Sequence, residues 1–223
     1  MFTTTLKFQD GHLYVSIDGF DWLLDTGAPT TFGDIGSLSI ETTEFTVPDS
    51  YMGLNATQLS GYVGHSTAGI IGADVLNEFY LLIDIQGEQV SFSTNEVELS
   101  GERVKLEEVM GVPIIHANIA GADRRMFFDT GAQISYLQDE SLNTFPSEGT
   151  VSDFYPGMEP FQTETYRVDV TIGETSQKLR CGSLPELLGM TLMIAGTEGI
   201  IGNEILSNRI VGYFPKQKQL VLA

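Results

Sequence analysis

The sequence predicts an all-β protein of two barrel-like lobes, related by pseudo-two-fold symmetry and containing few, short helices. First, the tetrapeptide Asp-Thr-Gly-Ala occurs twice, beginning at Asp25 and at Asp129, each time after two apolar residues. Second, a Gly-Ile-Ile-Gly segment follows each tetrapeptide, at 69–72 and at 199–202. Third, the intervening chain consists mainly of short alternating apolar and polar runs, which glycines separate at turn-like intervals. Because the motifs recur in the same order, the chain is an internal duplication.

The other elements follow the same order in each half. Two alternating runs around a turn lead into the tetrapeptide, at 6–20 and again at 112–128. After each Gly-Ile-Ile-Gly segment we expect a short helix and then two strands around a hairpin turn. The charged stretch 98–109 lacks the Pro or Ser richness of a flexible linker, so we interpret it as a connection between the halves. We therefore divide the chain into an N-terminal lobe, 1–103, and a C-terminal lobe, 104–223.

One further element is predicted in the second half alone. The chain between Asp129 and its next clear strand, 168–172, is much longer than the chain between Asp25 and the apparent counterpart at 37–40. The additional segment contains 152–167, where Pro-Gly stands between aromatic residues, as at the tip of a β-hairpin. We predict an inserted hairpin there, with no counterpart in the N-terminal lobe.

Composition limits the partners of the protein. The chain has 223 residues and a formal net charge of −19, and such an acidic surface argues against nucleic acid or an anionic membrane as a partner. No apolar run approaches the roughly 20 residues of a membrane span. The first residues lack the apolar core of a signal peptide. Cys181 is the single cysteine, so no internal disulfide can form. These observations predict a soluble, cytoplasmic protein.

Several other chemistries find no support in the sequence. The three histidines, His12, His65 and His116, are far apart and lack metal-ligand spacing, so we expect them to be structural or superficial. Cys181 has no histidine near it in the sequence, which argues against a thiol nucleophile. Neither a Gly-x-Ser-x-Gly motif nor a phosphate-binding loop is present. We expect no metal and no organic cofactor.

The repeated tetrapeptide suggests a pair of carboxyl groups. A strand delivers the aspartate, and the glycine permits a sharp turn with close backbone approach. If two such turns face each other across a pseudo-two-fold axis, the two carboxyl groups lie within hydrogen-bond reach. Like charges at that distance cannot both ionise, so the pair holds one proton and offers an acid and a base at the same pH. Such a pair can activate water against a carbonyl and protonate the leaving amine.

The doubled motif with its Ile-Ile-Gly segments resembles the aspartic proteases, and most of all two retropepsin units fused in tandem. Pepsin-like enzymes share the two-lobe plan but are considerably longer. The resemblance implies that Asp25 and Asp129 are the catalytic pair, and that the Ile-Ile-Gly segments support the two aspartate turns. The residues that match the family's supporting loop positions are Thr26, Gly27, Ala28, Thr130, Gly131 and Ala132.

The family also has a flap, a hairpin that closes over the substrate, and 152–167 resembles it. Pepsin-like enzymes carry the flap on the N-terminal lobe and retropepsin dimers carry two, whereas the candidate here belongs to the C-terminal half. The candidate substrate contacts on this hairpin are Tyr155, Gly157, Met158 and Phe161.

The resemblance implies an aspartic endopeptidase that cleaves extended, apolar-flanked peptides, as a monomer with both aspartates in one chain. Ala28 and Ala132 stand where pepsin-like enzymes usually carry a hydroxyl that donates to the carboxyl pair, so we expect a pH optimum less acidic than that of gastric-type enzymes. Two alternatives stay open. One is a catalytically silent module that binds a peptide or protein, and the other is an obligate homodimer in which equivalent halves pair.

Overall fold

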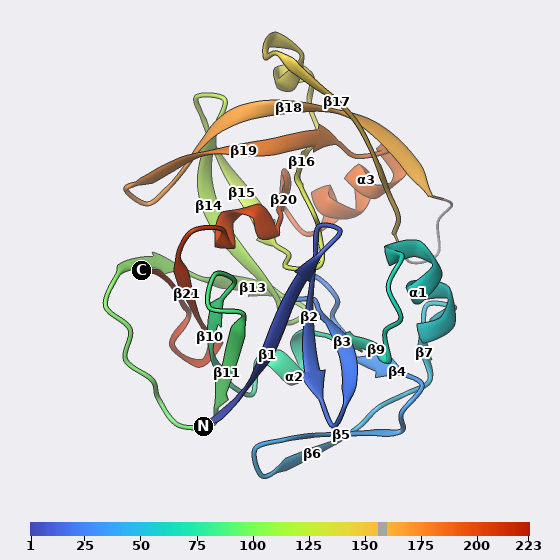
Figure 1. The fold of residues 1–223 in the computed structure, drawn as a ribbon. Helices are drawn as coiled ribbons and strands as arrows, with labels where there is room; N and C mark the ends of the chain where they lie inside the picture. The colour runs from blue at the N-terminus through green and yellow to red at the C-terminus, as the bar shows by residue number, and fades with distance from the viewer. Residues whose placement is uncertain (156–159) are drawn as a thin grey trace.

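The structure, a computed structural model, describes residues 1–155 and 160–223 and confirms the predicted all-β, two-lobed fold with few, short helices (Figure 1). The elements of the first half are β1 (Phe2–Gln9), β2 (His12–Ile17), β3 (Phe20–Leu24), β4 (Phe32–Gly33), β5 (Ser37–Ile40), β6 (Thr43–Thr46), β7 (Ser50–Tyr51), β8 (Leu54–Asn55), α1 (Ala56–Val63), β9 (Gly69–Ile71), α2 (Ala73–Leu76), β10 (Tyr80–Asp84) and β11 (Gln89–Ser93). Those of the second half are β12 (Glu102–Lys105), β13 (Glu107–Val109), β14 (Val112–Ile119), β15 (Ala122–Phe128), β16 (Ser135–Leu137), η1 (Glu140–Thr144), β17 (Ser147–Asp153), β18 (Phe161–Ile172), β19 (Thr175–Ser183), α3 (Glu186–Ile194), β20 (Gly199–Ile201), η2 (Asn203–Leu206), β21 (Ile210–Phe214), η3 (Pro215–Gln217) and β22 (Gln219–Leu222).

Strands of both halves share one ten-stranded sheet, in the order β12-β22-β21-β10-β11-β1-β2-β3-β9-β4. The first half ends with the hairpin β10–β11 and the second with the hairpin β21–β22, and the two hairpins are joined because β10 pairs antiparallel with β21. Strand β12 contains the predicted division at 103/104 and pairs with β22 at the sheet's edge. The two halves are therefore joined by backbone hydrogen bonds as well as by the connection.

The second half builds its own eight-stranded sheet, in the order β13-β14-β15-β20-β16-β19-β18-β17. Internal symmetry is clearest beside the two tetrapeptides. Strand β3 runs parallel to β9, with Leu24 opposite Ile71, and β15 runs parallel to β20, with Phe128 opposite Ile201. Each Asp-Thr-Gly-Ala motif therefore follows a buried strand that lies beside the Ile-Ile pair of its own half.

The halves differ most in the segment after the tetrapeptide. Strands β17 and β18 form a long antiparallel hairpin, in which Asp153 is opposite Phe161, and we call these two strands the flap hairpin. It arches across the top of the molecule in Figure 1 toward α1 of the first half. The expected match between 37–40 and 168–172 is wrong, because β5 pairs only with β6 in a separate two-stranded sheet.

The first half carries a small hairpin, β7–β8, followed directly by α1. Met52 and Gly53 form its turn with φ angles of 49° and 81°, which is typical of a tight two-residue hairpin loop. Asn55 then caps α1 by accepting from the Gln58 amide, while the Gln58 side chain accepts from the Asn55 amide. Gly64 ends the helix at a φ of 69°. The Asn55 cap and Gly64 therefore fix where α1 begins and ends.

One large apolar core extends through both halves and includes the strands that deliver the tetrapeptides. A smaller cluster lies beneath α1 in the first half, where Leu54, Leu59 and Ile70 are buried and Phe154 of the second half packs against them. Two asparagines also join the halves. Asn77 donates to the carbonyl oxygen of Gly111 at 2.8 Å, and Asn203 donates to that of Gly11 at 2.7 Å. Each half thus binds the first hairpin turn of the other.

Candidate active site

Asp25 and Asp129 begin the loops that follow β3 and β15. The Asp25 amide donates to the carbonyl oxygen of Ile71 at 3.1 Å, and the Asp129 amide donates to that of Ile201 at 2.9 Å. A second backbone hydrogen bond holds the far end of each loop. In the first half, the Ala73 amide donates to the carbonyl oxygen of Ala28 at 2.8 Å. The corresponding bond in the second half, from Asn203 to Ala132, is 2.9 Å long. Each Gly-Ile-Ile-Gly segment, together with the residue that follows it, therefore holds the aspartate loop of its own half by backbone hydrogen bonds.

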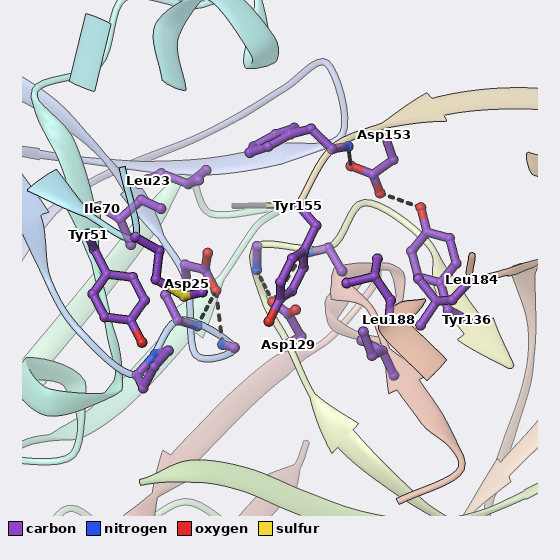
Figure 2. A pocket seen from close by; sticks show the side chains of 18 of the residues that line it. Leu23, Asp25, Tyr51, Ile70, Asp129, Tyr136, Asp153, Tyr155, Leu184 and Leu188 are labelled. Atoms are coloured by element: carbon purple, nitrogen blue, oxygen red, sulfur yellow. Dashed lines mark hydrogen bonds between the residues drawn. The ribbon is translucent and has the colours of Figure 1, made fainter. Parts of the chain in front are cut away.

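The two carboxyl groups lie close to each other in a cleft that both halves line, and Figure 2 shows them with the backbone amides that orient them. Oδ1 of Asp25 accepts from the amides of Gly27 and Ala28, both at 2.9 Å. Oδ1 of Asp129 accepts from those of Gly131 and Ala132, at 2.8 and 3.1 Å. The repeated tetrapeptide thus orients each carboxyl group in the same way toward its counterpart.

Burial raises the pKa of Asp25. Burial, and then the negative charge of Asp25, raise the pKa of Asp129 well above its usual range. The backbone amides oppose both shifts, because they donate to the charged form. The two groups titrate as a coupled pair, so the protons belong to the pair rather than to either residue. The arrangement can hold one proton over the pH range in which two separate aspartates would both be ionised.

Only glycine fits at positions 27 and 131, because the carboxyl group of the opposite aspartate lies against each of them. A Cβ atom on Gly27 would lie 2.2 Å from Cγ of Asp129, and one on Gly131 would lie 2.4 Å from Cγ of Asp25. Both distances are far shorter than real contacts, and neither carboxyl group can move away without breaking its amide hydrogen bonds. The third residue of each motif therefore makes room for the aspartate of the other motif.

Thr26 and Thr130 join the two loops beneath the carboxyl pair. Oγ1 of each threonine accepts from the backbone amide of the other, at 3.0 Å in both directions. The Thr26 hydroxyl also donates to the carbonyl oxygen of Phe128 at 2.7 Å, and the Thr130 hydroxyl donates to that of Leu24 at 2.8 Å. All four bonds cross between the halves and are buried. They fix the distance between the loops and so between the two aspartates.

Both halves line the cleft above the aspartates, and most of the lining is apolar. Figure 2 shows Leu23, Tyr51 and Ile70 on the side of Asp25, and Tyr136, Leu184 and Leu188 on the side of Asp129. The flap hairpin and the chain after β17 contribute Asp153, Phe154, Tyr155 and Phe161. Such a cleft, apolar with a few convergent polar groups, is typical of a substrate site.

Of the four candidate substrate contacts predicted within 152–167, the structure places Tyr155 and Phe161 in the cleft lining. Tyr155 is partly exposed and points into the cleft on the side of Asp129 (Figure 2). Phe161 packs edge-on against Tyr136, with ring centroids 6.2 Å apart. Gly157 and Met158 lie outside the described residues.

The flap hairpin contacts both halves at its cleft end. Ser152 accepts a hydrogen bond through its carbonyl oxygen from Gln133 at 3.1 Å, and Asp153 accepts one from the Tyr136 hydroxyl. Phe154, the next residue, stacks on Tyr62 of α1 with ring centroids 4.9 Å apart. Consecutive residues thus bind the second half and the first half, and the chain crosses the cleft between them.

Several residues at the site were not predicted from the sequence. Tyr51 and Met52 of the β7–β8 hairpin line the cleft from the N-terminal half, opposite the flap hairpin. The turn glycine Gly53 was the available signal, but Met52 occupies the position where Asn or Asp usually marks such a turn. His12, which we expected to be only structural or superficial, lies against the second aspartate loop, with Nδ1 3.1 Å from the carbonyl oxygen of Gly131. No signal in the sequence indicates that contact.

Within the described part of the chain, no group of three or more His, Cys, Asp or Glu side chains could hold a metal ion. Cys181 is buried in the core. In the same residues, no helix is both long and apolar enough to span a membrane.

Comparison with solved structures agrees with this architecture. The fold is similar to that of an aspartic proteinase from Irpex lacteus, with a TM-score of 0.57 and 12% identity over 100% of this chain and 96% of that one. It is also similar to basic 7S globulin from soybean, with a TM-score of 0.53 and 9% identity over 99% of this chain and 94% of the other. A retropepsin-like aspartic protease from Rickettsia conorii matches 57% of this chain and 96% of its own, with a TM-score of 0.39 and 17% identity.

No protein-family model matches the sequence, and no curated protein is detectably similar to it. The likenesses to the Irpex lacteus proteinase and to the soybean globulin, at low identity, show the fold. The class that they define is the two-lobed fold of the pepsin-like aspartic proteases.

Proposed function

We propose that this protein is an aspartic endopeptidase that hydrolyses peptide bonds in extended, apolar-flanked peptides. The observation that carries the proposal is the close approach of two carboxyl groups, Asp25 and Asp129, in the cleft. Bringing two carboxyl groups together in a partly buried site costs free energy, and four buried threonine hydrogen bonds maintain that arrangement. Costly proximity of titratable groups is typical of catalytic sites.

The pair would act as acid and base in the same step. With one proton between them, the ionised carboxylate takes a proton from a water molecule, which attacks the carbonyl carbon of the peptide bond. The protonated carboxyl group donates its proton to the carbonyl oxygen, so the tetrahedral intermediate is neutral. The carboxyl group that took the water's proton then donates it to the amide nitrogen, and the other carboxylate takes a proton back from a hydroxyl of the intermediate. The C–N bond breaks, which releases an amine and a carboxylic acid and leaves one proton on the pair. The raised pKa values keep this singly protonated state available over a wider pH range.

The cleft above the pair suits a peptide in extended conformation. Leu23 and Ile70 on one side, and Leu184 and Leu188 on the other, offer apolar contacts to side chains on both sides of the cleaved bond. The flap hairpin would lie over the bound peptide. Grooves of this kind bind the backbone as an added strand and use pockets for alternate side chains. We further propose that the monomer is active, because both aspartates come from one chain.

The test is digestion of a peptide library at several pH values by the wild-type protein and by Asp25→Asn and Asp129→Asn. We expect cleavage by the wild type alone, while all three bind a statine-type transition-state mimic or a substrate peptide. Asp18→Asn, which removes an exposed carboxylate outside the cleft, is the matched control and should cleave normally. Unchanged turnover in Asp25→Asn would exclude the pair as the catalyst.

Two other outcomes would support the alternatives. Peptide binding without cleavage by the wild type at any pH would indicate a catalytically silent binding module. Sedimentation during turnover addresses the assembly, since a fully active monomer excludes an obligate homodimer. A chelator should leave the rate unchanged, because the proposed step uses no metal.

A further inference from the structure

A third carboxyl group, that of Asp153, lies in the cleft and has no part in the proposed hydrolysis. It belongs to the last residue of β17 and lines the same cleft as Asp25 and Asp129. Its Oδ2 accepts from the Tyr136 hydroxyl, and its Oδ1 accepts from the Phe154 amide at 2.8 Å (Figure 2). These two donors fix the orientation of the carboxyl group but bring no positive charge.

The surroundings of Asp153 are mostly apolar. Phe161 is opposite it in the flap hairpin, and Leu184 and Leu188 line the same side of the cleft. Burial raises the pKa of Asp153. The titratable groups that face it are the Tyr136 hydroxyl and His12, and burial lowers the pKa of His12, so that neither supplies a cation near neutral pH. Among the described residues that line the cleft, none is Lys, Arg or His.

A partly buried carboxylate without a cationic partner is costly, and a cation from a ligand would offset that cost. A lysine or arginine side chain fits both the apolar wall and the carboxylate of this part of the cleft. Its methylene stem can pack against Phe161, Leu184 and Leu188, while its charged end reaches the carboxylate. A glutamate side chain in the same place would add a negative charge beside Asp153 and near the aspartate pair.

We propose that Asp153 is a specificity-determining residue, which makes one subsite of the cleft select a basic side chain of the peptide. This inference rests on the proposed function, in that the peptide is taken to be the substrate. The net charge of −19 acts in the same direction, because it raises the local concentration of cationic peptides. The selected substrate is therefore apolar around the cleaved bond except for one Lys or Arg in the subsite next to Asp153.

The experiment compares peptides that differ at one position, which carries lysine, norleucine or glutamate. Norleucine has the same unbranched stem as lysine without its charge, so the ratio of kcat/KM values isolates the charge. At one position near the cleaved bond we expect the wild type to prefer lysine over norleucine by roughly 10- to 100-fold, as for a hydrogen bond to a charged group. Glutamate should be the poorest substrate there.

Two variants separate the charge of Asp153 from its structural contacts. Asp153→Asn has no charge; its carbonyl oxygen can still accept from the Phe154 amide, and its NH2 group can donate to the Tyr136 oxygen. Its lysine-to-norleucine ratio should fall close to one. Tyr136→Phe removes the hydroxyl contact and leaves the charge, so its ratio should stay well above one. Asp18→Asn makes the same change in net charge outside the cleft and should leave the ratio unchanged.

The pH dependence of the ratio provides a second readout. The aspartate pair acts on both peptides, so its titration cancels in the ratio. The ratio should then rise with pH as Asp153 ionises, from near one in acid, and it should be flat in Asp153→Asn. A purely structural role for Asp153 would not change the ratio with pH. If Asp153→Asn does not fold, this wild-type profile decides alone.

The proposal is overturned if norleucine serves as well as lysine at every position, or if Asp153→Asn keeps the preference. Failure of the proposed hydrolysis is distinguishable from failure of this inference. If no peptide is cleaved, calorimetry with Asp25→Asn and the same peptides measures binding directly. Tighter binding of the lysine peptide would then uphold the role of Asp153, whereas equal binding, or no binding, would overturn it.

Discussion

Thr26 and Thr130 each accept a hydrogen bond from the backbone amide of the other, across the boundary between the two halves, at equal distances of 3.0 Å. The equality follows from the pseudo-two-fold arrangement of two identical tetrapeptides. Each hydroxyl also donates to the backbone of the opposite half, so each threonine connects two groups that would otherwise be buried without a partner. These four hydrogen bonds therefore stabilise the contact between the two halves directly beneath the carboxyl pair.

The first prediction is that Thr26→Ala and Thr130→Ala lower the free energy of unfolding by similar amounts, of about 2–4 kcal/mol. Each substitution leaves a buried amide and a buried carbonyl unpaired, and an unsatisfied buried group costs about 1–3 kcal/mol. Urea denaturation of the two variants measures the loss. Thr26→Ser keeps the hydroxyl and is the control, for which most of the stability should remain. Markedly unequal losses in the two alanine variants would show that the two sides are not equivalent in solution.

The second prediction concerns Asp25→Asn, which should be more stable than the wild type near neutral pH. Burial raises both pKa values of the pair, so the folded protein holds protons that the unfolded chain releases as the pH rises above the usual range of aspartate. The pair's contribution to the free energy of unfolding therefore falls as the pH rises through this window. Asparagine has no charge to bury, and each pKa unit of penalty that it removes adds about 1.4 kcal/mol.

Denaturation of wild type and Asp25→Asn across the pH range tests this sign. The stability difference should be small in acid, where the pair is protonated, and should grow in favour of the variant toward neutral pH. Asp18→Asn, at an exposed position, should follow the wild type throughout. A difference that stays constant with pH would mean that the pair does not titrate in the way its burial implies.

The third prediction is that serine at positions 28 and 132 shifts the acidic limb of the pH–rate profile to lower pH. The backbone amides of Ala28 and Ala132 already donate to Oδ1 of Asp25 and Asp129. A hydroxyl at either position could donate to the carboxyl pair as well and would stabilise its ionised form, which lowers the first pKa of the pair. The wild type, without that donor, should be optimal at a less acidic pH than the double variant.

The profile of kcat/KM against pH, for the wild type and Ala28→Ser/Ala132→Ser, measures the shift. The corresponding double cysteine variant is the control, because a thiol is similar in size but a weak donor. A shift of equal size in the cysteine variant would assign the effect to bulk beside the aspartates instead of to hydrogen bonding.

The repeated motifs made the fold and the position of the aspartates predictable, because two short local sequences recur in the same order in each half. Asp-Thr-Gly-Ala requires a strand, a turn and room for a second copy, and Gly-Ile-Ile-Gly supplies the parallel strand beside it. Order and repetition therefore implied the symmetry. The match between 37–40 and 168–172 failed because both are strand-like in sequence, and strand propensity does not specify the partner strand.

The walls of the cleft could not be predicted in this way. Tyr51, Tyr136 and Asp153 come from three separate segments, and only the tertiary fold brings them to one cleft. A tyrosine in a strand and an aspartate at a strand end have no local signature of a binding site. His12 is similar, since its contact with the Gly131 carbonyl depends on the first hairpin of one half reaching the aspartate loop of the other. Such contacts are set by tertiary packing between the halves.

The last prediction is that the stack between Tyr62 and Phe154 holds the flap hairpin closed. With the hairpin in its present position the cleft encloses about 130 Å³, below the roughly 300–1,000 Å³ of typical ligand pockets, so an extended peptide requires the hairpin to lift. Phe154 must then leave Tyr62 and the apolar cluster beneath α1. An aromatic pair contributes about 0.5–1.5 kcal/mol beyond its buried area, so Tyr62→Ala should make opening roughly 2- to 12-fold more frequent.

Amide hydrogen exchange in β17 and β18 measures the opening, and the association rate of a substrate peptide should rise with it. A double-mutant cycle with Tyr62→Ala and Phe154→Ala isolates the coupling between the two rings. Tyr62→Phe keeps the stack and removes only the hydroxyl of an exposed side chain, so it should behave as the wild type does. If the cycle gives no coupling energy, the two rings are neighbours without consequence, and the Ser152 and Asp153 contacts to the second half alone set the position of the hairpin.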